Sequence, residues 1–236
     1  MLRQSIPGFE RIMQNEEPKN SIIIVEGPPG SLKSAFVFTA LNNHAKEANT
    51  KGLYLTLEQS KERHMLNLKN MGLVIDEHGP VKVIDYGYSR KLAKLKGMVE
   101  GLEWIIDSIK EYNKKHSEVF SCLVIDSLNA LYTMAGTLRE RSDIYFFFEE
   151  LRKIEGTILI VAEMPSHPEM GLDGLLMGAE LFLSDGLIDL GMIEVDSKVG
   201  RYIQIKKMRG VKHSLDKYSI GIDEGRGVVV LEELIV

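Results

Sequence analysis

Lys33 and Ser34 stand side by side after a short loop, residues 27–32, that contains two glycines and two prolines. An ammonium group next to a hydroxyl suits a polyphosphate, because the ammonium neutralises phosphate charge and the hydroxyl binds Mg²⁺. Backbone N–H groups of the loop and the positive end of a following helix would face the phosphate oxygens. The pattern predicts a nucleoside triphosphate site. The residues expected at its phosphates are Gly27, Pro28, Pro29, Gly30, Ser31, Leu32, Lys33, Ser34 and Ala35.

Leu32 is the point at which this loop departs from the usual phosphate-binding pattern, G-x-x-x-x-G-K-[S/T]. It occupies the position of the second glycine, immediately before the lysine, whereas Gly27 and Gly30 remain. We expect the loop to form around these two glycines and to bind nucleotide, while the rate of turnover stays open. The alternative is an ordinary connection between a strand and a helix, which a glycine-proline turn alone does not exclude.

Two acidic residues follow apolar strand patterns further along the chain. Asp126 ends the run 121–126, and Glu58 follows the run 53–57. In open α/β sheets the carboxyl ends of the strands carry the ligand chemistry. An aspartate delivered by a buried strand is typical of the residue that supports Mg²⁺ together with the loop hydroxyl, here Ser34. The alternatives are that Asp126 caps the next turn and that Glu58 is a solvated surface residue.

The elements that must position these residues alternate between strand and helix. The loop follows an apolar β-branched run, which predicts a buried strand, and it precedes a helical pattern. The predicted strands are 22–25, 53–57, 81–84, 121–126 and 157–162. The predicted helices are 34–48, 60–71, 93–116 and one that is capped by Ser142 or Asp143 and closed by Gly156. This alternation predicts a mostly parallel sheet flanked by helices.

The two ends of the chain differ from this pattern. The polar segment 1–20 is expected to pack a short helix before the first strand. After residue 185, four strand patterns follow one another without helices, which indicates antiparallel strands that extend the parallel sheet. These patterns are 187–195, 201–207, 217–222 and 227–234. We expect residues 1–236 to form a single α/β domain.

The bulk composition argues against several classes of protein. With 236 residues, of which 44% are hydrophobic and 27% charged, the chain has an ordinary globular composition. Its formal net charge of −5 gives no bulk attraction for nucleic acid. The single cysteine, Cys122, excludes an internal disulfide, and its apolar surroundings indicate a core thiol. Without an apolar run of about 18 residues or a signal-peptide pattern, we expect a cytoplasmic protein and no membrane span.

Taken together, several motifs resemble the KaiC-like branch of the RecA-fold ATPases. They are the phosphate loop, the strand 54–58, the segment 124–131, the run Lys207-Met208-Arg209-Gly210 with His213 after it, and the lead-in 6–9. The similarity covers nearly the whole chain in the same order, and the segments 124–131 and 207–210 are its most specific parts. The resemblance implies a RecA-like P-loop NTPase core with antiparallel C-terminal strands.

The resemblance also implies roles for individual residues. Glu58 would be the general base that activates the attacking water, and Lys33, Ser34 and Asp126 would hold phosphate and Mg²⁺. Lys207 and Arg209 would reach, together with Met208, the phosphates of a neighbouring subunit's nucleotide, and His213 would lie near the same interface. The implied protein binds ATP or ADP with Mg²⁺, forms a homo-oligomer, as a hexameric ring, and couples its nucleotide state to a protein partner.

Two departures from that family limit what is carried over. Gln59 stands where many members have a second glutamate, which leaves one candidate base. The chain has one ATPase domain and lacks the duplicated arrangement and the phosphorylated tail region of the clock protein, so no circadian or autokinase role is inferred.

Other functions stay open from the sequence. A recombinase-like ATPase would bind DNA through the segments after 126 and 162, of which the first offers Arg139 and Arg141. The second is acidic, with Glu169 and Asp173 among its residues and no Lys or Arg between 153 and 198, so nucleic-acid binding is not expected. A nucleotide-gated scaffold with little turnover is the other alternative. Lys206, Lys207 and Arg209 would then be a solvated strand edge.

Overall fold

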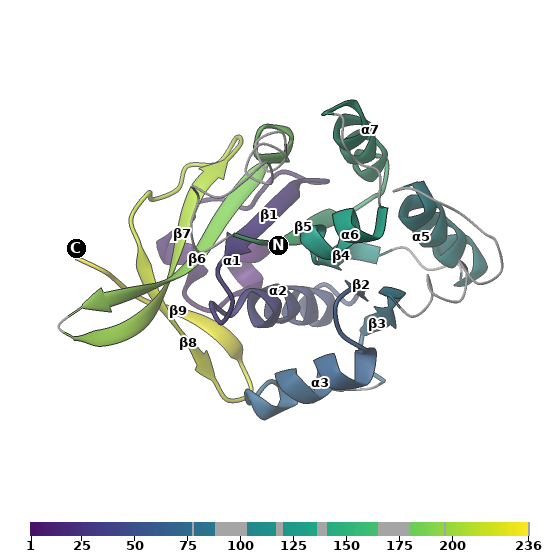
Figure 1. Ribbon diagram of the computed structural model, residues 1–236. Helices are drawn as coiled ribbons and strands as arrows, with labels where there is room; N and C mark the ends of the chain where they lie inside the picture. The colour runs from purple at the N-terminus through teal and green to yellow at the C-terminus, as the bar shows by residue number, and fades with distance from the viewer. Residues whose placement is uncertain are drawn as a thin grey trace.

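The fold is described from a computed structural model, which covers residues 1–76, 78–87, 103–116, 120–135, 141–164, 180–195 and 197–235. Within these residues one nine-stranded sheet has the order β3-β2-β4-β5-β1-β6-β7-β8-β9 (Figure 1). Its strands are β1 (Ile22–Gly27), β2 (Lys51–Thr56), β3 (Val81–Asp85), β4 (Phe120–Asp126), β5 (Thr157–Glu163), β6 (Gly186–Val195), β7 (Lys198–Met208), β8 (Tyr218–Asp223) and β9 (Gly227–Glu233).

Helices cover both faces of the sheet (Figure 1). On one face, α2 (Lys33–Glu47) and α3 (Lys61–Asn70) pack with the short helices α1 (Leu2–Ser5) and η1 (Phe9–Arg11). On the other face lie α5 (Glu103–His116), α6 (Leu128–Ala135) and α7 (Arg141–Arg152). Each face has its own apolar core, and β1 contributes to both because its side chains alternate between the faces. The mostly parallel sheet flanked by helices is confirmed.

β1 is the central strand of the nine-stranded sheet, and this position fixes the phosphate loop. It pairs in parallel with β5 on one side and with β6 on the other. All six of its residues are buried, as its run of β-branched residues predicts. The loop therefore starts from a strand that is held by hydrogen bonds along both edges.

The antiparallel C-terminal strands are confirmed, because β6 with β7, β7 with β8 and β8 with β9 all pair antiparallel. β6 also pairs in parallel with β1, which was not predicted. Nothing local in the sequence distinguishes the two directions. The chain leaves β5 at the carboxyl edge with Glu163 beside Gly27, and β6 begins at the amino edge with Gly186 beside Ile23. α6 was also missed, although Ser127 caps it by accepting a hydrogen bond from the Ala130 N–H at 3.3 Å and Gly136 follows it in the sequence. The first ten residues of the predicted helix 93–116 lie outside the described residues.

The lead-in packs as expected and also contacts the end of the chain. Ile6, Phe9 and Met13 are fully buried in the core beside α2. The Val230 N–H of β9 donates to the Pro7 carbonyl at 2.8 Å, and Met13 forms a bridge with His213. Cys122 is buried as predicted, and burial raises the pKa of its thiol. The lead-in therefore belongs to the body of the fold.

Candidate nucleotide site

The loop after β1 adopts a tight turn in which Leu32 takes the backbone conformation of a glycine. Leu32 has φ 72° and ψ 18°, the left-handed region, and it is the N-cap of α2. Gly30 is also left-handed, with φ 84°. For a residue with a Cβ this conformation costs about 1–2 kcal/mol. The loop therefore keeps its left-handed turn before the lysine although the glycine is replaced, and the surrounding structure supports the strain.

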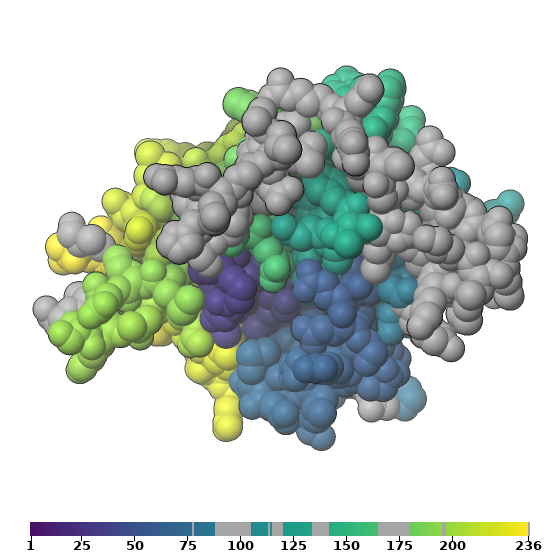
Figure 2. Space-filling model, viewed as in Figure 1, coloured from purple at the N-terminus to yellow at the C-terminus, as the bar shows by residue number. Residues whose placement is uncertain are grey.

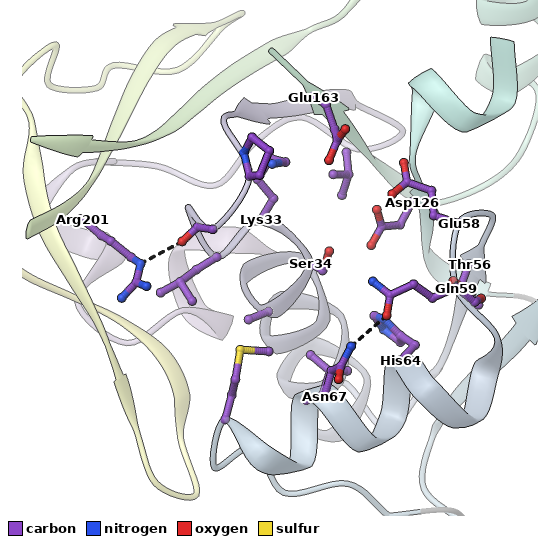
Figure 3. A pocket seen from close by; sticks show the side chains of 17 residues that line it. Lys33, Ser34, Thr56, Glu58, Gln59, His64, Asn67, Asp126, Glu163 and Arg201 are labelled. Carbon is purple, nitrogen blue, oxygen red and sulfur yellow. Dashed lines mark hydrogen bonds between the residues drawn. The ribbon is translucent and has the colours of Figure 1, made fainter. Parts of the chain in front are cut away.

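Four contacts hold the loop in this shape. A Cβ on Gly27 would lie 1.9 Å from the Leu190 carbonyl oxygen, so only glycine fits there. The Ser31 hydroxyl and the Lys33 ammonium both donate to the Pro28 carbonyl, each at 2.9 Å. From β7, Arg201 donates its Nε–H to the Gly30 carbonyl at 2.9 Å (Figure 3). The loop is thus held from within and from a strand about 170 residues further along the chain.

Three carboxylates gather opposite the loop, at the carboxyl ends of three neighbouring strands (Figure 3). Asp126 ends β4, Glu163 ends β5, and Glu58 lies two residues past the end of β2. In register, Asp126 pairs with Thr56 on one side and with Val161 on the other. The glutamates therefore flank Asp126, Glu163 from the end of β5 and Glu58 from the turn that follows β2. The sequence predicted Glu58 and Asp126 for this site but assigned no role here to Glu163.

Asp126 is the most enclosed of the three acids, with 9% of its surface exposed. Burial raises the pKa of its carboxyl group, and hydrogen bonds from Tyr54 and Ser34 lower it in part. The Tyr54 hydroxyl donates to Asp126 from a fully buried position, and the ring of His64 lies 4.5 Å from the Tyr54 ring. Burial lowers the pKa of His64 to about 4, so this imidazole is neutral at pH 7. Asp126 is thus positioned by buried neutral groups.

Lys33 is the positive centre of the site, with 7% of its surface exposed. Burial lowers the pKa of its ammonium, while the charges of Glu163, Asp126 and Glu58 raise it, with Glu163 contributing most. One ammonium faces three carboxylates, so a polyphosphate enters a site that already has an excess of negative charge. Additional positive charge is needed there, and a divalent cation supplies it.

The donor set fits Mg²⁺ held jointly with phosphate. Among the residues that the structure describes, no three His, Cys, Asp or Glu side chains are grouped to hold a metal ion by themselves. Mg²⁺ usually keeps water ligands and is bound by one or two protein oxygens together with substrate phosphates. The Ser34 hydroxyl and the Asp126 carboxylate, which contact each other, are such a pair.

A pocket of about 350 Å³ joins these groups, and it extends along α3. Figure 2 shows the purple early chain at the surface between blue α3 and the lime β6–β7 hairpin, which stands out from the body. The lining residues missed from the sequence are Thr56, Gln59, His64, Asn67, Leu68, Met71, Val161, Glu163 and Arg201. Asn67 donates to Gln59 at 2.8 Å, so Gln59 is held within the pocket wall. Glu163 carried a signal that could have been used, since it too follows a buried strand.

Lys207 and Arg209 lie at the opposite edge of the sheet from their own pocket. Met208 pairs with Gly186 at the amino end of β6, whereas Asp189 lies beside Glu26 next to the loop. Lys207 donates to the carbonyls of Leu181 and Ser184 at 2.8 and 2.6 Å. These two residues therefore cannot contact a nucleotide bound by the same chain.

Asp185 organises that amino edge. Its carboxylate accepts from the Ile22 N–H at 3.0 Å and from Arg152 at 2.8 Å, and Arg209 lies 3.4 Å away. Arg209 also donates to the Phe182 carbonyl at 2.7 Å, yet 53% of its side chain is exposed. Its guanidinium is thus oriented by the chain and still accessible at the surface.

A β-bulge gives this part of β7 its shape. Leu187 pairs with Lys207 and Ile188 with Ile205, so Lys206 is an extra residue in the ladder. Ile203, Ile205 and Met208 all point into the core beside α2, which leaves Lys206 and Lys207 together on the other face. Lys206 there forms an ion pair with the buried Glu26 at 2.9 Å and with Asp189 at 3.2 Å. A strand without the bulge would have placed the two lysines on opposite faces.

Two further residues expected near phosphate have structural roles within the chain. Met208 is 5% exposed and packs in the core. The expected phosphate contact of its side chain is therefore wrong, and Met208 is a core residue. His213 bridges Met13 of the lead-in and its ring contacts the Ser214 carbonyl.

The features that would decide DNA binding lie mostly beyond the described residues. Arg139, Glu169 and Asp173 are outside the described ranges, and the side chain of Arg141 is not described either. In the described part of the chain, no helix combines the length and the apolar character that a bilayer span requires.

The fold and the site together define a class of protein. A parallel sheet whose central strand runs into a lysine-serine phosphate loop, with an aspartate two strands away, is a RecA-type P-loop nucleotide-binding core. The family model for the KaiC ATPases matches residues 2–235, and the chain belongs to that family. The KaiC-like, RecA-fold assignment made from the motifs is therefore confirmed.

Relatives match over the full length. A UPF0273 protein of Aeropyrum pernix is 27% identical over 100% of this chain and 95% of its own, and one of Thermotoga maritima is 26% identical over 97% and 95%. Among solved structures, a KaiC-like protein of Pyrococcus horikoshii superposes with a TM-score of 0.75, 23% identity and 97% coverage of both chains. This likeness supports the fold.

Proposed function

We propose that the protein is a Mg²⁺-dependent ATPase that acts as a homo-oligomeric ring in the cytoplasm and couples its nucleotide state to a protein partner. The observation that carries the proposal is the loop around Leu32, which keeps the left-handed turn of a phosphate-binding loop and sets Lys33 and Ser34 opposite Asp126. Family membership supports ATP as the substrate.

The residues divide the work of hydrolysis. Loop N–H groups and Lys33 hold the β- and γ-phosphates, and Ser34 with Asp126 would bind Mg²⁺, which offsets the charge of the phosphates. Glu58 accepts a proton from the attacking water as its oxygen bonds to the γ-phosphorus. The bond between this phosphorus and the bridging oxygen breaks, and its electron pair stays on ADP. Hydrogen bonding from the Ser127 hydroxyl orients the Glu58 carboxylate for this step.

The location of Arg209 supports an oligomeric site. It is half-exposed, oriented by Asp185, and separated from its own pocket by the length of β1. A cation at that edge contributes to phosphate chemistry only in a neighbouring subunit, so we propose that Arg209, with Lys207 beside it, completes the neighbour's site. Lys207 must first leave the carbonyls that it caps. Six subunits are the number expected from the family resemblance.

The test is ATP binding and phosphate release by the purified chain, with and without Mg²⁺, over a range of protein concentrations. We expect binding that requires Mg²⁺ and a specific activity that rises with concentration as subunits assemble. Nucleotide binding with assembly but without phosphate release would instead favour a nucleotide-gated scaffold. A chain that binds no nucleoside triphosphate would overturn the proposal.

A further inference from the structure

Glu163 is the carboxylate of the pocket that has no assigned task. Its strand, β5, lies directly between β1, which leads into the phosphate loop, and β4, which ends in Asp126. In register it pairs with Gly27, the first residue of the loop. Neighbouring strands are about 4.8 Å apart, so the backbone of Glu163 is one strand from the loop, whereas that of β2, which precedes Glu58, is three strands away.

The side chain of Glu163 points into the pocket on the same side as Asp126. Val161 lies opposite Asp126, and Glu163 is two residues further along, which keeps it on the same face of the sheet. Figure 3 shows its carboxylate between Lys33 on one side and Asp126 with Glu58 on the other. Of the three acids, its charge acts most strongly on Lys33. It therefore faces the position where Lys33 would hold the terminal phosphate.

The backbone at Glu163 is fixed from two directions. The Asn129 side chain at the start of α6 accepts from the Glu163 N–H at 2.7 Å and donates to the Glu163 carbonyl at 3.2 Å. The next residue, Met164, donates its N–H to the Gly27 carbonyl at 3.2 Å. The backbone of Glu163 is thus held in a constant relation to both the loop and the segment that follows Asp126.

We infer that Glu163 is a second carboxylate of the hydrolysis site and shares with Glu58 the orientation and deprotonation of the attacking water. Two glutamates that line the pocket on either side of Asp126 can both accept a hydrogen bond from one water in line with the γ-phosphate. The water oxygen bonds to the γ-phosphorus, one glutamate takes the released proton, and the electron pair of the broken phosphorus–oxygen bond leaves on ADP. This inference rests on the proposed ATPase function. It replaces the expectation that Glu58 is the one candidate base, which followed from Gln59 standing where many family members have a second glutamate.

The experiment compares Glu58→Gln, Glu163→Gln and the double variant in steady-state hydrolysis of Mg-ATP. We expect each single change to lower kcat by about 10-fold and the double change by about 10³-fold, because either carboxylate partly substitutes for the other. Glutamine keeps the size of the side chain, and the Asn129 contacts involve only backbone. Glu232→Gln, an exposed glutamate on β9, is the matched control and should leave kcat unchanged.

A second measurement separates this role from a structural one. Removing the Glu163 charge also removes its repulsion of the terminal phosphate, so Glu163→Gln should raise the affinity for ATP relative to ADP several-fold. An unchanged kcat and ATP/ADP affinity ratio in Glu163→Gln, or a double variant no slower than Glu58→Gln alone, would overturn the inference. If the wild-type chain neither binds nor hydrolyses ATP, the proposed function itself fails, which is a different outcome.

Discussion

At the carboxyl edge of the parallel strands, one ammonium, that of Lys33, faces three carboxylates around an open pocket. At the amino edge the numbers reverse, because one carboxylate, that of Asp185, faces the guanidinium groups of Arg152 and Arg209 and a backbone N–H. The first edge gains by binding a polyphosphate with a cation. At the second edge Asp185 pairs with cations of its own chain, and Arg209 is still half-exposed. If Arg209 completes a neighbour's site as proposed, the carboxyl edge is a receiving edge, which binds the nucleotide, and the amino edge is a donating edge, which supplies a cation to the next subunit.

The largest expected effect comes from the donating edge. If Arg209 acts on a neighbour's nucleotide, Arg209→Ala should lower kcat about 10³-fold, as for other arginine fingers, while nucleotide affinity changes less than two-fold. Hydrolysis and nucleotide titration check this, with Arg226→Ala as control because that exposed arginine pairs only locally with Asp223. Unchanged hydrolysis, with no dependence on protein concentration, would remove the proposed asymmetry between the edges.

At the receiving edge, Lys33→Ala should weaken nucleotide binding about 10- to 100-fold. The loss of a charged hydrogen-bond donor is worth about 1.5–3 kcal/mol, and three carboxylates are then left without their counter-charge. A fluorescent nucleotide titration measures the change, and Lys153→Ala, at an exposed residue directly after α7, is the control. Affinity equal to that of the control would mean that the pocket does not hold phosphates through this residue.

The contacts of Asp185 at the amino edge should also make the free energy of unfolding depend on pH in the acid range. Burial by itself raises the pKa of Asp185, but the Ile22 N–H, Arg152 and Arg209 outweigh it and hold the pKa below its usual 3.8. A lowered folded-state pKa stabilises the protein above the unfolded value, and this stabilisation is lost as the pH falls through the folded value. We expect Asp185→Asn to cost about 1–3 kcal/mol at pH 7.

Denaturant unfolding at several pH values checks the Asp185 prediction. The difference between wild type and Asp185→Asn should shrink as the pH falls below 3.8, because wild type then loses the same charge. Asp223→Asn, at an exposed ion pair, serves as the matched control. A difference that stays constant down to the lowest pH would show that the carboxylate charge is not what stabilises this edge.

The smallest expected effect concerns the strain at Leu32. Both Leu32→Ala and Leu32→Gly remove the side chain, but only glycine relieves the left-handed conformation. The glycine variant should therefore unfold with a free energy about 1 kcal/mol higher than the alanine variant, the reverse of their order in a helix interior. Thermal or denaturant unfolding of the pair measures this difference. Equal stability would mean that the loop relaxes out of the left-handed turn.

The parts of the site that depend on local sequence were predictable. The loop, Lys33, Ser34 and Asp126 were identified because a buried strand, a turn and a helix follow one another within a few residues. Arg201 was not predictable, because it contacts Gly30 across a separation of 171 residues in the sequence, and no local pattern indicates that β7 lies beside the loop.

The role of Glu163 depends on strand order, which the chain does not reveal locally. β5 follows β4 in sequence, but it inserts between β4 and β1 in the sheet. That insertion brings Glu163 next to Gly27 and turns an ordinary strand-end glutamate into a pocket residue. The parallel pairing of β6 with β1 escaped prediction for the same reason, since its apolar sequence suits either orientation.

The extra residue at Lys206 makes the length of β7 matter as much as its composition. Removing either Lys206 or Lys207 would restore strict side-chain alternation, and Met208 and Arg209 would keep their faces. One lysine would then remain on the face where Lys206 now pairs with Glu26 and Lys207 donates to the Leu181 and Ser184 carbonyls. A single-codon deletion in this strand would thus leave either the buried Glu26 or these carbonyls without a cation, while every other side chain kept its place.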